Sequence, residues 1–327
     1  MTPAACVVVA TRGRSERLAR LIGALEAQRA PWPFEVVVVD DASPDGTWEQ
    51  LQRLAEASSV PVRAVRRAVH GGAAAARNVG WRAASAPIVA FTDDDCAPQP
   101  DWLTRLVERC QAGADLVQGR TEADPAQLGA MGPFGRTVEC REEGLYPTCN
   151  VAYRRQLLEE LGGFDESFRR SCEDTDLAWR AREAGARAAY ASDAVVFHDV
   201  HPSSYVSYLR EKLRWVDEPR LVRRHPGLRQ GQLHQRYVWR ASHPRAVVAG
   251  AGLLLAGSAV SKPICRRARV AVGLALTAPY LRFRTYHDPL RCGPRRRWLL
   301  MGPALFADLF EVAITVAGAV RHRTPLL

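Results

Sequence analysis

Residues 36–41 read Val36-Val37-Val38-Val39-Asp40-Asp41, four β-branched residues followed by two acids. An unbroken apolar run of this kind is typical of a strand in a parallel sheet that helices cover on both faces. Another valine run stands at residues 7–9, and apolar residues at helical spacing (Leu18, Leu21, Leu25) lie between the two runs. The order strand, helix, strand predicts an α/β fold with a mostly parallel central sheet flanked by helices.

The alternation continues along the chain. Residues 62–65 are expected to form a third strand, residues 73–84 a helix of small residues, and residues 88–91 a fourth strand that runs into Asp93-Asp94-Asp95. Ligands of such sheets bind beyond the carboxyl ends of the strands. We therefore expect the acids at 40–41 and 93–95 to lie at one edge of the sheet.

The middle of the chain is less regular. Residues 112–148 are rich in glycine and proline and show no clear period. Regular patterns return with a helix that Gly162-Gly163 closes, a helix over residues 173–184 and a short strand at 194–197 that ends at His198. Glycine after a helical stretch is a common helix end.

Charge and apolarity divide the chain. The net charge is +10, and residues 206–327 hold 22 basic residues against 6 acidic ones. Residues 246–260 and 270–281 are apolar, but a 15-residue helix is roughly 22 Å long, short of the ~30 Å hydrocarbon core of a bilayer. A re-entrant hairpin with arginines at its turn, or two buried helices, fits better. Residues 298–320 predict an amphipathic helix on a membrane or on the core, with Asp308, Glu311 and Thr315 on one side.

Several classes of protein are disfavoured. The basic part interleaves with apolar helices rather than with stacking aromatics, which argues against nucleic-acid binding. The eight cysteines form no C-x-x-C pair, so we expect reduced thiols rather than a zinc or iron–sulfur site. The first residues lack a basic region before an apolar run, so we expect no signal peptide and a cytoplasmic location.

The acids at 93–95 are the sharpest chemical signal. On extended backbone Asp93 and Asp95 point the same way and Asp94 turns aside. Their oxygens suit Mn²⁺ or Mg²⁺, with His198 completing the ligand set; the alternatives are a solvated acidic turn and an ordinary polar histidine. Acids at the start of the helix at 173 are common caps, although a carboxylate held ionised there is also ready to accept a proton.

The motifs together resemble the family 2 nucleotide-sugar glycosyltransferases of the GT-A fold. The resemblance covers about residues 4–200, and its motifs are residues 7–14, 36–47, 76–80, 91–95, 162–165 and 173–177. Residues 308–327 resemble the membrane-associated C-terminus of some bacterial members. The pair Ser171-Cys172 departs from the family pattern, where many members have an aromatic residue and a glycine, and this bears on acceptor preference.

The resemblance implies an inverting, metal-dependent transfer of a sugar from a UDP-, GDP- or dTDP-sugar to an acceptor hydroxyl, in the synthesis of an envelope glycan, a glycolipid or a natural product. Asp174 would be the catalytic base. Asp95, Asp93 and His198 would hold Mn²⁺ or Mg²⁺. The nucleotide sugar would meet Thr11, Arg12, Asp41, Arg77, Asp93 and Asp94. Asn150 and Glu173 would lie on the acceptor side.

The resemblance also implies a division of the chain. We expect a GT-A catalytic domain over residues 1–205, with a nucleotide-binding half at about 1–111 and an acceptor-side half at about 112–205. A basic helical linker over 206–244 and a helical C-terminal region over 245–327 would follow. The basic tail would attach the protein to an anionic membrane surface on the cytoplasmic face, near an acceptor that is lipid-linked.

Two other functions are open to the sequence. A sugar-phosphate nucleotidyltransferase would carry a glycine-rich phosphate loop after its first strand, whereas residues 11–14 here are Thr-Arg-Gly-Arg. A non-catalytic, membrane-bound nucleotide-sugar binding module would keep the acids only as helix caps. Binding of a nucleotide sugar without turnover would favour the binding module.

Overall fold

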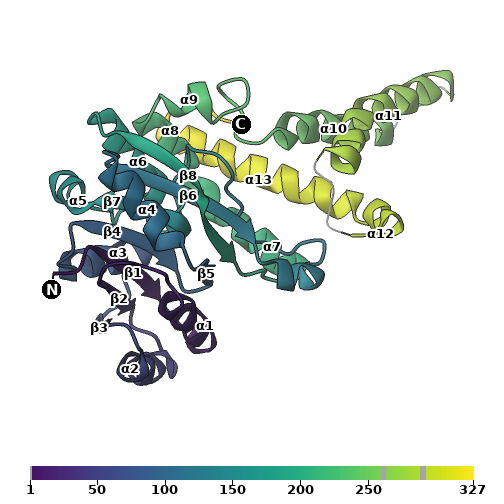
Figure 1. Ribbon diagram of the computed structural model, residues 1–327. Coiled ribbons are helices and arrows are strands. Elements are labelled where there is room, and N and C mark those ends of the chain that lie inside the picture. Colours follow the sequence, from purple (N-terminus) through teal and green to yellow (C-terminus); the bar gives the residue numbers. More distant parts are fainter. Residues whose placement is uncertain (1, 259–262, 288–291) are drawn as a thin grey trace. The chain divides into compact units, whose positions relative to one another are not determined.

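The computed structural model describes residues 2–258, 263–287 and 292–327, and strands between residues 5 and 198 form a mixed sheet (Figure 1). The sheet has eight strands in the order β3-β2-β1-β4-β7-β6-β8-β5. The strands are β1 (Ala5–Thr11), β2 (Phe34–Asp40), β3 (Val62–Arg66), β4 (Ile88–Asp93), β5 (Cys96–Pro98), β6 (Leu116–Ala123), β7 (Val151–Arg154) and β8 (Ala188–His198). The pairs β1–β2, β2–β3, β1–β4 and β6–β8 are parallel, and the other three are antiparallel. The predicted α/β fold with a mostly parallel sheet is confirmed.

Helices cover both faces of this sheet. They are α1 (Ser15–Glu26), α2 (Thr47–Ala57), α3 (Ala73–Ala83), α4 (Trp102–Gln111), α5 (Arg155–Leu161) and α6 (Glu173–Glu183), with short 3₁₀ turns η1 (Pro125–Ala130) and η2 (Thr148–Asn150). Val7 and Val36 pack with α1, α2 and α4, whereas Val8 and Val37 pack with α3, α5 and α6. Alternate residues of each valine run therefore enter opposite cores, which is why the runs are apolar throughout.

Strand β6 lies in the stretch where the sequence predicted no regular element. It contains Gly119 and four polar or charged residues, so its pattern is weak. A Cβ at Gly119 would lie 2.2 Å from Oδ1 of Asn150. The glycine is needed for this close approach. Because glycine is unusual inside a strand, it also weakens the strand signal in the sequence.

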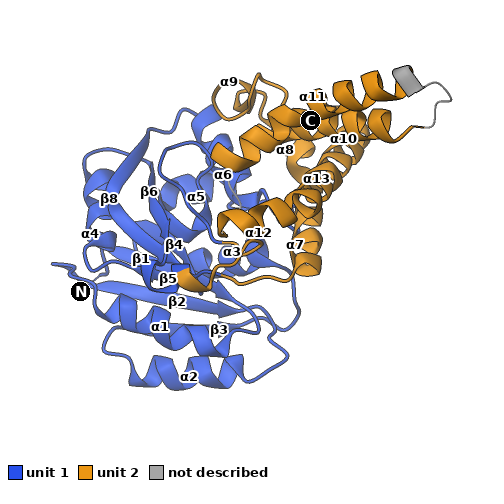
Figure 2. Ribbon diagram, turned by 90° about the vertical axis from the view of Figure 1, so that its right-hand side faces the viewer, with its two compact units in different colours: residues 1–128, 137–200 blue, residues 129–136, 201–327 orange. Residues whose placement is uncertain are grey.

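The chain forms two compact units, residues 1–128 with 137–200 (unit 1) and residues 129–136 with 201–327 (unit 2) (Figure 2). Unit 1 holds the sheet. The elements of unit 2 are α7 (Tyr205–Lys212), η3 (Leu213–Asp217), α8 (Glu218–Arg224), α9 (Leu228–Gly231), α10 (Ser242–Gly257), α11 (Pro263–Tyr286), α12 (Pro294–Leu299) and α13 (Met301–His322). The domain boundaries expected at residues 205 and 244 stay predictions.

The two apolar segments of the tail form α10 and α11. The arginines expected at the turn between them, Arg266, Arg267 and Arg269, instead lie in the first turns of α11, and residues 259–262 lie outside the described residues. The helix expected over 298–320 is interrupted at Leu300, between α12 and α13.

Candidate functional site

The carboxyl ends of β1, β2 and β4 lie side by side in unit 1. Thr11 is level with Asp40, and Ala10 is level with Asp93. The backbone N–H of Asp41 donates to the carbonyl of Thr11 over 2.9 Å. The fold thus brings Thr11, Asp41 and the three acids at 93–95 to one edge of the sheet, as the strand pattern predicted.

Asp41 stabilises the loop over residues 67–72, which precedes α3. Its carboxylate accepts hydrogen bonds from the N–H groups of Gly71 (3.1 Å) and Gly72 (2.8 Å), contacts Nδ1 of His70 at 2.7 Å, and pairs with Arg67. Burial alone would raise the pKa of Asp41, but the two backbone N–H groups, with Arg67 and His70, hold it below its ordinary value. Asp41 is ionised and buried, so in this structure it shapes the loop that borders the edge.

The three consecutive acids are divided between two arginines. Asp93 accepts from Arg77 (2.8 Å), whereas one amino group of Arg14 donates to both Asp94 (2.7 Å) and Asp95 (2.8 Å). The expectation that Asp93 and Asp95 share one side and Asp94 turns aside is wrong. Strand β4 ends at Asp93, and the next two residues form a turn, so the alternation of extended backbone does not continue.

Asp94 is the most enclosed of these acids. Its Oδ2 accepts from the hydroxyl of Thr11 over 2.7 Å. Burial raises the pKa of Asp94 to about 6, and the opposing charge of Arg14 does not cancel this effect. The contact explains how Thr11 belongs to the same cluster: its hydroxyl positions an acid of the neighbouring strand end.

Asp95 and His198 lie close enough together to hold a cation between them. Nε2 of His198 lies 3.4 Å from Oδ1 of Asp95, and both side chains are buried. Nδ1 of His198 lies 2.8 Å from the carbonyl oxygen of Asp199 and donates to it, so Nε2 is the ring nitrogen that faces Asp95. Arg14 and Arg17 hold the other oxygen, Oδ2, of Asp95. A carboxylate oxygen and an imidazole nitrogen that converge in this way fit Mn²⁺ or Mg²⁺.

Cys96 is the third member of this group. The ligand atoms of Asp95, Cys96 and His198 lie within 4.8 Å of one another because β5 pairs with β8 and places Cys96 level with His198. Burial raises the pKa of the Cys96 thiol well above its ordinary value, so the sulfur stays protonated and is a poor ligand for a hard cation. Asp93 is not in this group.

Arg77 joins the strand edge to the start of α6. It lies on α3, is buried, and donates to Asp93 over 2.8 Å and to Glu173 over 2.9 Å. Burial opposes its charge, but the fields of Asp93, Glu173 and Asp174 outweigh burial and raise the pKa of Arg77. One guanidinium therefore bridges the two acidic segments.

Asp174 lies in the first turn of α6 and is half-buried. Its Oδ1 accepts from the N–H of Thr175 over 2.8 Å, as expected at the positive end of a helix. Asp176, two residues on, is fully buried and pairs with Arg180 at 2.9 Å. Of these two acids, Asp176 stabilises the fold and Asp174 lies toward Arg77 and the acids of the sheet edge.

Two of the expected site residues make none of the contacts described above for the acids at the strand ends. Asn150 is fully buried: its amide accepts from Trp102 (2.8 Å) and donates to the carbonyls of Arg120 (2.9 Å) and Ala194 (3.0 Å). Asn150 thus ties β6 and β8 together in the interior. Arg12 is exposed, directly after β1.

The arginines at and just after the start of α1 were not among the site residues expected from the sequence. Arg14, Arg17 and Arg20 are spaced by three residues and therefore share one side of the helix. Arg14 and Arg17 contact Asp95, and Arg20 pairs with Asp124 and Asp199. The spacing was visible in the sequence, but a charged helix face usually points to solvent, and only the fold shows acids opposite it.

Two protein-family models match overlapping stretches of the chain. Residues 6–162 match the family model described as glycosyl transferase family 2, and residues 134–281 match glycosyl transferase family group 2. Glycosyltransferase AglE of Haloferax volcanii is 28% identical over 211 residues, which are 61% of this chain and 68% of that protein. A pre-mycofactocin glycosyltransferase of Mycobacterium tuberculosis is 32% identical over 210 residues, 59% of this chain but only 42% of that protein.

A solved structure shares the fold. Mannosyltransferase PcManGT from Pyrobaculum calidifontis, solved in complex with GDP-Man and Mn²⁺, superposes with a TM-score of 0.60 at 21% identity. The match covers 97% of this chain and 88% of that one.

Proposed function

The chain belongs to glycosyltransferase family 2 and has the GT-A fold, and from this premise we propose that it transfers a sugar from a nucleoside-diphosphate sugar to an acceptor hydroxyl with inversion at the anomeric carbon. Donor and acceptor would lie on opposite sides of Arg77. The donor would lie over the carboxyl ends of β1, β2 and β4. The acceptor would approach from α6.

On the donor side, we assign Asp95 and His198 to a divalent cation, Mn²⁺ or Mg²⁺. When bound, the cation would neutralise the negative charge that develops on the departing nucleoside diphosphate. Arg14 and Arg17 hold one oxygen of Asp95 and leave the other facing His198, which supports this assignment. Thr11, Arg12, Asp41, Arg77, Asp93 and Asp94 would border the nucleotide sugar.

On the acceptor side, Asp174 is the proposed base, with Glu173 beside it. The acceptor oxygen forms a bond to the anomeric carbon while the bond from that carbon to the diphosphate oxygen breaks. The hydroxyl proton passes to the carboxylate of Asp174. Its place in the first turn of α6 keeps this carboxylate ionised and ready to accept a proton. Attack from the side opposite the leaving group inverts the anomeric centre.

The observation that carries the proposal is the double contact of Arg77. Asp93 and Glu173 are far apart in sequence, and Arg77 lies within hydrogen-bond distance of both. This contact supports a single site in which the acids at the strand ends and the start of α6, where the proposed base lies, serve one reaction. A binding module that kept its acids only as helix caps would have no need of this bridge.

The test is turnover with a panel of UDP-, GDP- and dTDP-sugars. We expect transfer or slow hydrolysis of one donor with Mn²⁺ or Mg²⁺, and loss of turnover on chelation and in Asp95→Asn. The anomeric configuration of the product, read by NMR coupling constants, distinguishes inversion from retention. Binding of a nucleotide sugar without turnover on any acceptor would refute the proposed activity.

We also propose that the acceptor is carried by a lipid and that the enzyme works at the cytoplasmic face of the cell membrane. The apolar, basic helices of unit 2 support this location. A chain held at the surface would meet soluble nucleotide sugars and membrane-bound acceptors together.

A further inference from the structure

Helix α13 has its polar side turned inward. Asp308, Glu311 and Thr315 are at most 1% exposed, whereas Phe306 and Val320 are 57% and 75% exposed. The sequence correctly divides this helix into two sides, and the structure buries the polar one. A soluble surface helix shows the opposite arrangement.

Ion pairs within unit 2 account for the inward charges. Asp308 accepts from Arg284 over 2.6 Å and from the hydroxyl of Tyr280 over 2.8 Å. Glu311 pairs with Lys212 and Arg240. Because its acids are neutralised inside, α13 presents only uncharged side chains outward through most of its length, up to the arginines that follow Val320.

The outward apolar surface continues over α10 and α11. Leu254 is 77% exposed and Leu274 is 61% exposed. The two helices pack through small residues: a Cβ on Gly252 would lie 2.7 Å from the carbonyl oxygen of Gly273. This close backbone contact leaves the large side chains on the outside, and such packing is characteristic of helices in lipid.

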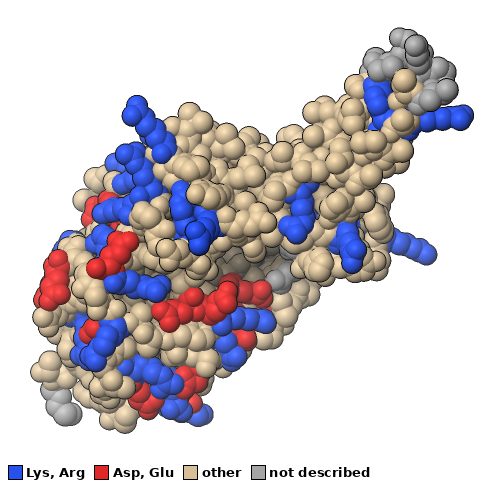
Figure 3. Space-filling model, turned by 90° about the horizontal axis from the view of Figure 1, so that it is seen from above, with Lys and Arg blue, Asp and Glu red and all other residues tan. Residues whose placement is uncertain are grey.

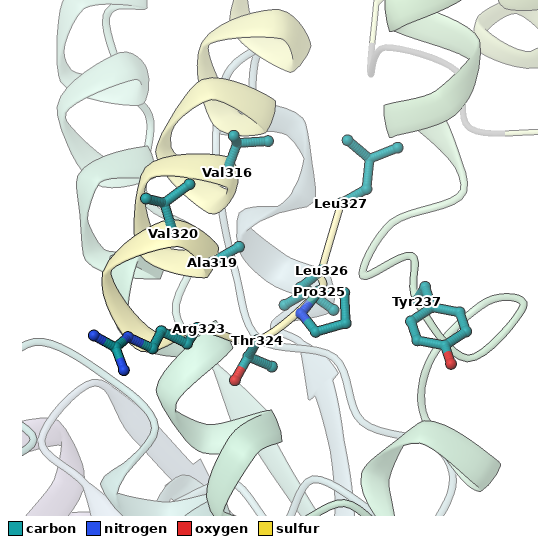
Figure 4. Close-up of a pocket in the computed structure, with 9 residues that line it drawn as sticks. All are labelled: Tyr237, Val316, Ala319, Val320, Arg323, Thr324, Pro325, Leu326 and Leu327. Carbon is teal, nitrogen blue, oxygen red and sulfur yellow. The ribbon is translucent and has the colours of Figure 1, made fainter.

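A pocket of about 470 Å³ lies at the C-terminal end of the outer side of α13. Val316, Ala319 and Val320 line it from the helix, with Leu326 and Tyr237 across from them (Figure 4). The backbones of residues 237–239 and 327 hydrogen-bond to each other and close one side. The lining is almost entirely apolar, so the pocket extends the apolar surface.

Basic residues surround this apolar surface. Arg266 and Arg267 are exposed at the start of α11, Arg295 and Arg296 on α12, and Arg323 after α13. The acids that the structure describes in α10–α13 are Asp308 and Glu311, both buried. Figure 3 shows basic side chains and no acidic ones over these helices on the face in view.

We propose that the outer sides of α10, α11 and α13, here called the lipid-facing surface, enter one leaflet of an anionic bilayer, with the arginines of α11 and α12 on the lipid phosphates. The apolar surface matches acyl chains, and the purely basic exposed charge matches anionic headgroups. The inference deepens the membrane location proposed above by naming the surface that binds.

The lipid-facing surface lies along the membrane rather than crossing it. Among the described residues α13 is the helix long and apolar enough to span a bilayer by length and composition, but half of that segment is buried. Helices α7, α8 and α10 and the turn η3 contact α13. A helix covered by its own protein on one side is suited to the boundary between protein and lipid.

The test is co-sedimentation of the full chain with vesicles, without nucleotide sugar or metal. We expect binding to vesicles of phosphatidylcholine with phosphatidylglycerol. Leu254→Glu combined with Leu274→Glu should weaken this binding on the order of 100-fold, because two apolar side chains no longer enter lipid. Arg266→Gln with Arg267→Gln should weaken it roughly 30-fold on anionic vesicles and little on pure phosphatidylcholine.

Leu128→Glu is the matched control, since it places the same charge on an exposed leucine of unit 1 and should leave vesicle binding unchanged. Circular dichroism melting of each variant checks that it is folded. The inference is overturned if the wild-type chain binds neither kind of vesicle. It is also overturned if ultracentrifugation shows a stable dimer that the two leucine substitutions dissociate. Vesicle binding is measured without a sugar donor, so it can be interpreted even if the proposed transferase activity is not found.

Discussion

Replacing Arg77 by methionine tests whether one guanidinium holds the two acidic segments together. Methionine keeps most of the length and the apolar stem but removes both charge-assisted hydrogen bonds, to Asp93 at 2.8 Å and to Glu173 at 2.9 Å. Losing one partner of a buried ion pair costs about 3–5 kcal/mol. The side chain of Asp93 is 26% exposed and can be hydrated in part, so we expect the low end, about 3 kcal/mol.

The assay is urea unfolding of the full chain followed by circular dichroism, together with steady-state kinetics on the donor identified in the panel. We expect kcat/KM to fall about 100-fold, because the strand-end acids and the first turn of α6 lose their common partner and the reacting groups are misplaced. Arg77→Lys should recover part of the stability, since a single ammonium group can reach one acid but not both.

Arg180→Met is the matched control. Arg180 also pairs with a buried acid of α6, Asp176, at 2.9 Å, and donates to the carbonyls of Leu161 and Gly163. The Arg180→Met substitution should lower the free energy of unfolding by a similar amount. It should leave kcat/KM near the wild-type value under conditions where both variants are folded. If Arg77→Met stays fully active, or loses no more activity than Arg180→Met, then Arg77 does not couple the two segments.

Three further predictions follow from the acids of each unit. Asp95→Asn should weaken Mn²⁺ binding at least tenfold, roughly the effect of disturbing a ligand set, as read from the EPR signal of free Mn²⁺; equal affinity would contradict the cation assignment. Asp174→Asn should lower kcat by about 10²–10⁴ while calorimetry finds an unchanged donor Kd, and a full-rate variant would exclude Asp174 as the base. In unit 2, burial alone would raise the pKa of Glu311, but Arg240 and Lys212 lower it from 4.5 to about 2. The folded state therefore gains roughly 3 kcal/mol from Glu311 above pH 4.5 and loses it as the pH falls toward 2. The stability difference between wild type and Glu311→Gln, measured by urea unfolding, should shrink over that range; a constant difference would show that the charge of Glu311 is not responsible.

Sequence periodicity was sufficient for most of the sheet. The runs at residues 7–9 and 36–39 are apolar at every position because neighbouring residues enter different cores, and this local property identifies β1 and β2 without knowledge of their partners. The edge where Thr11, Asp41 and Asp93 gather followed from the same reasoning, since parallel strands end on the same side. Strand β6 was not predicted, because Gly119 is required by a close contact with Asn150, which is distant in sequence, and not by a local pattern.

Only the tertiary structure decided where each charged side chain points. Asp94 and Asp95 turn to Arg14, which precedes them by about eighty residues in the chain, and no local rule fixes a direction beyond the end of a strand. The inversion of α13 has the same origin. Helical spacing separates Asp308, Glu311 and Thr315 from the apolar side, but it cannot say which side is interior. Cations from distant segments, Arg284, Lys212 and Arg240, make the interior the lower-energy place for the acids, because a buried carboxylate is stable only beside a partner that the fold itself supplies.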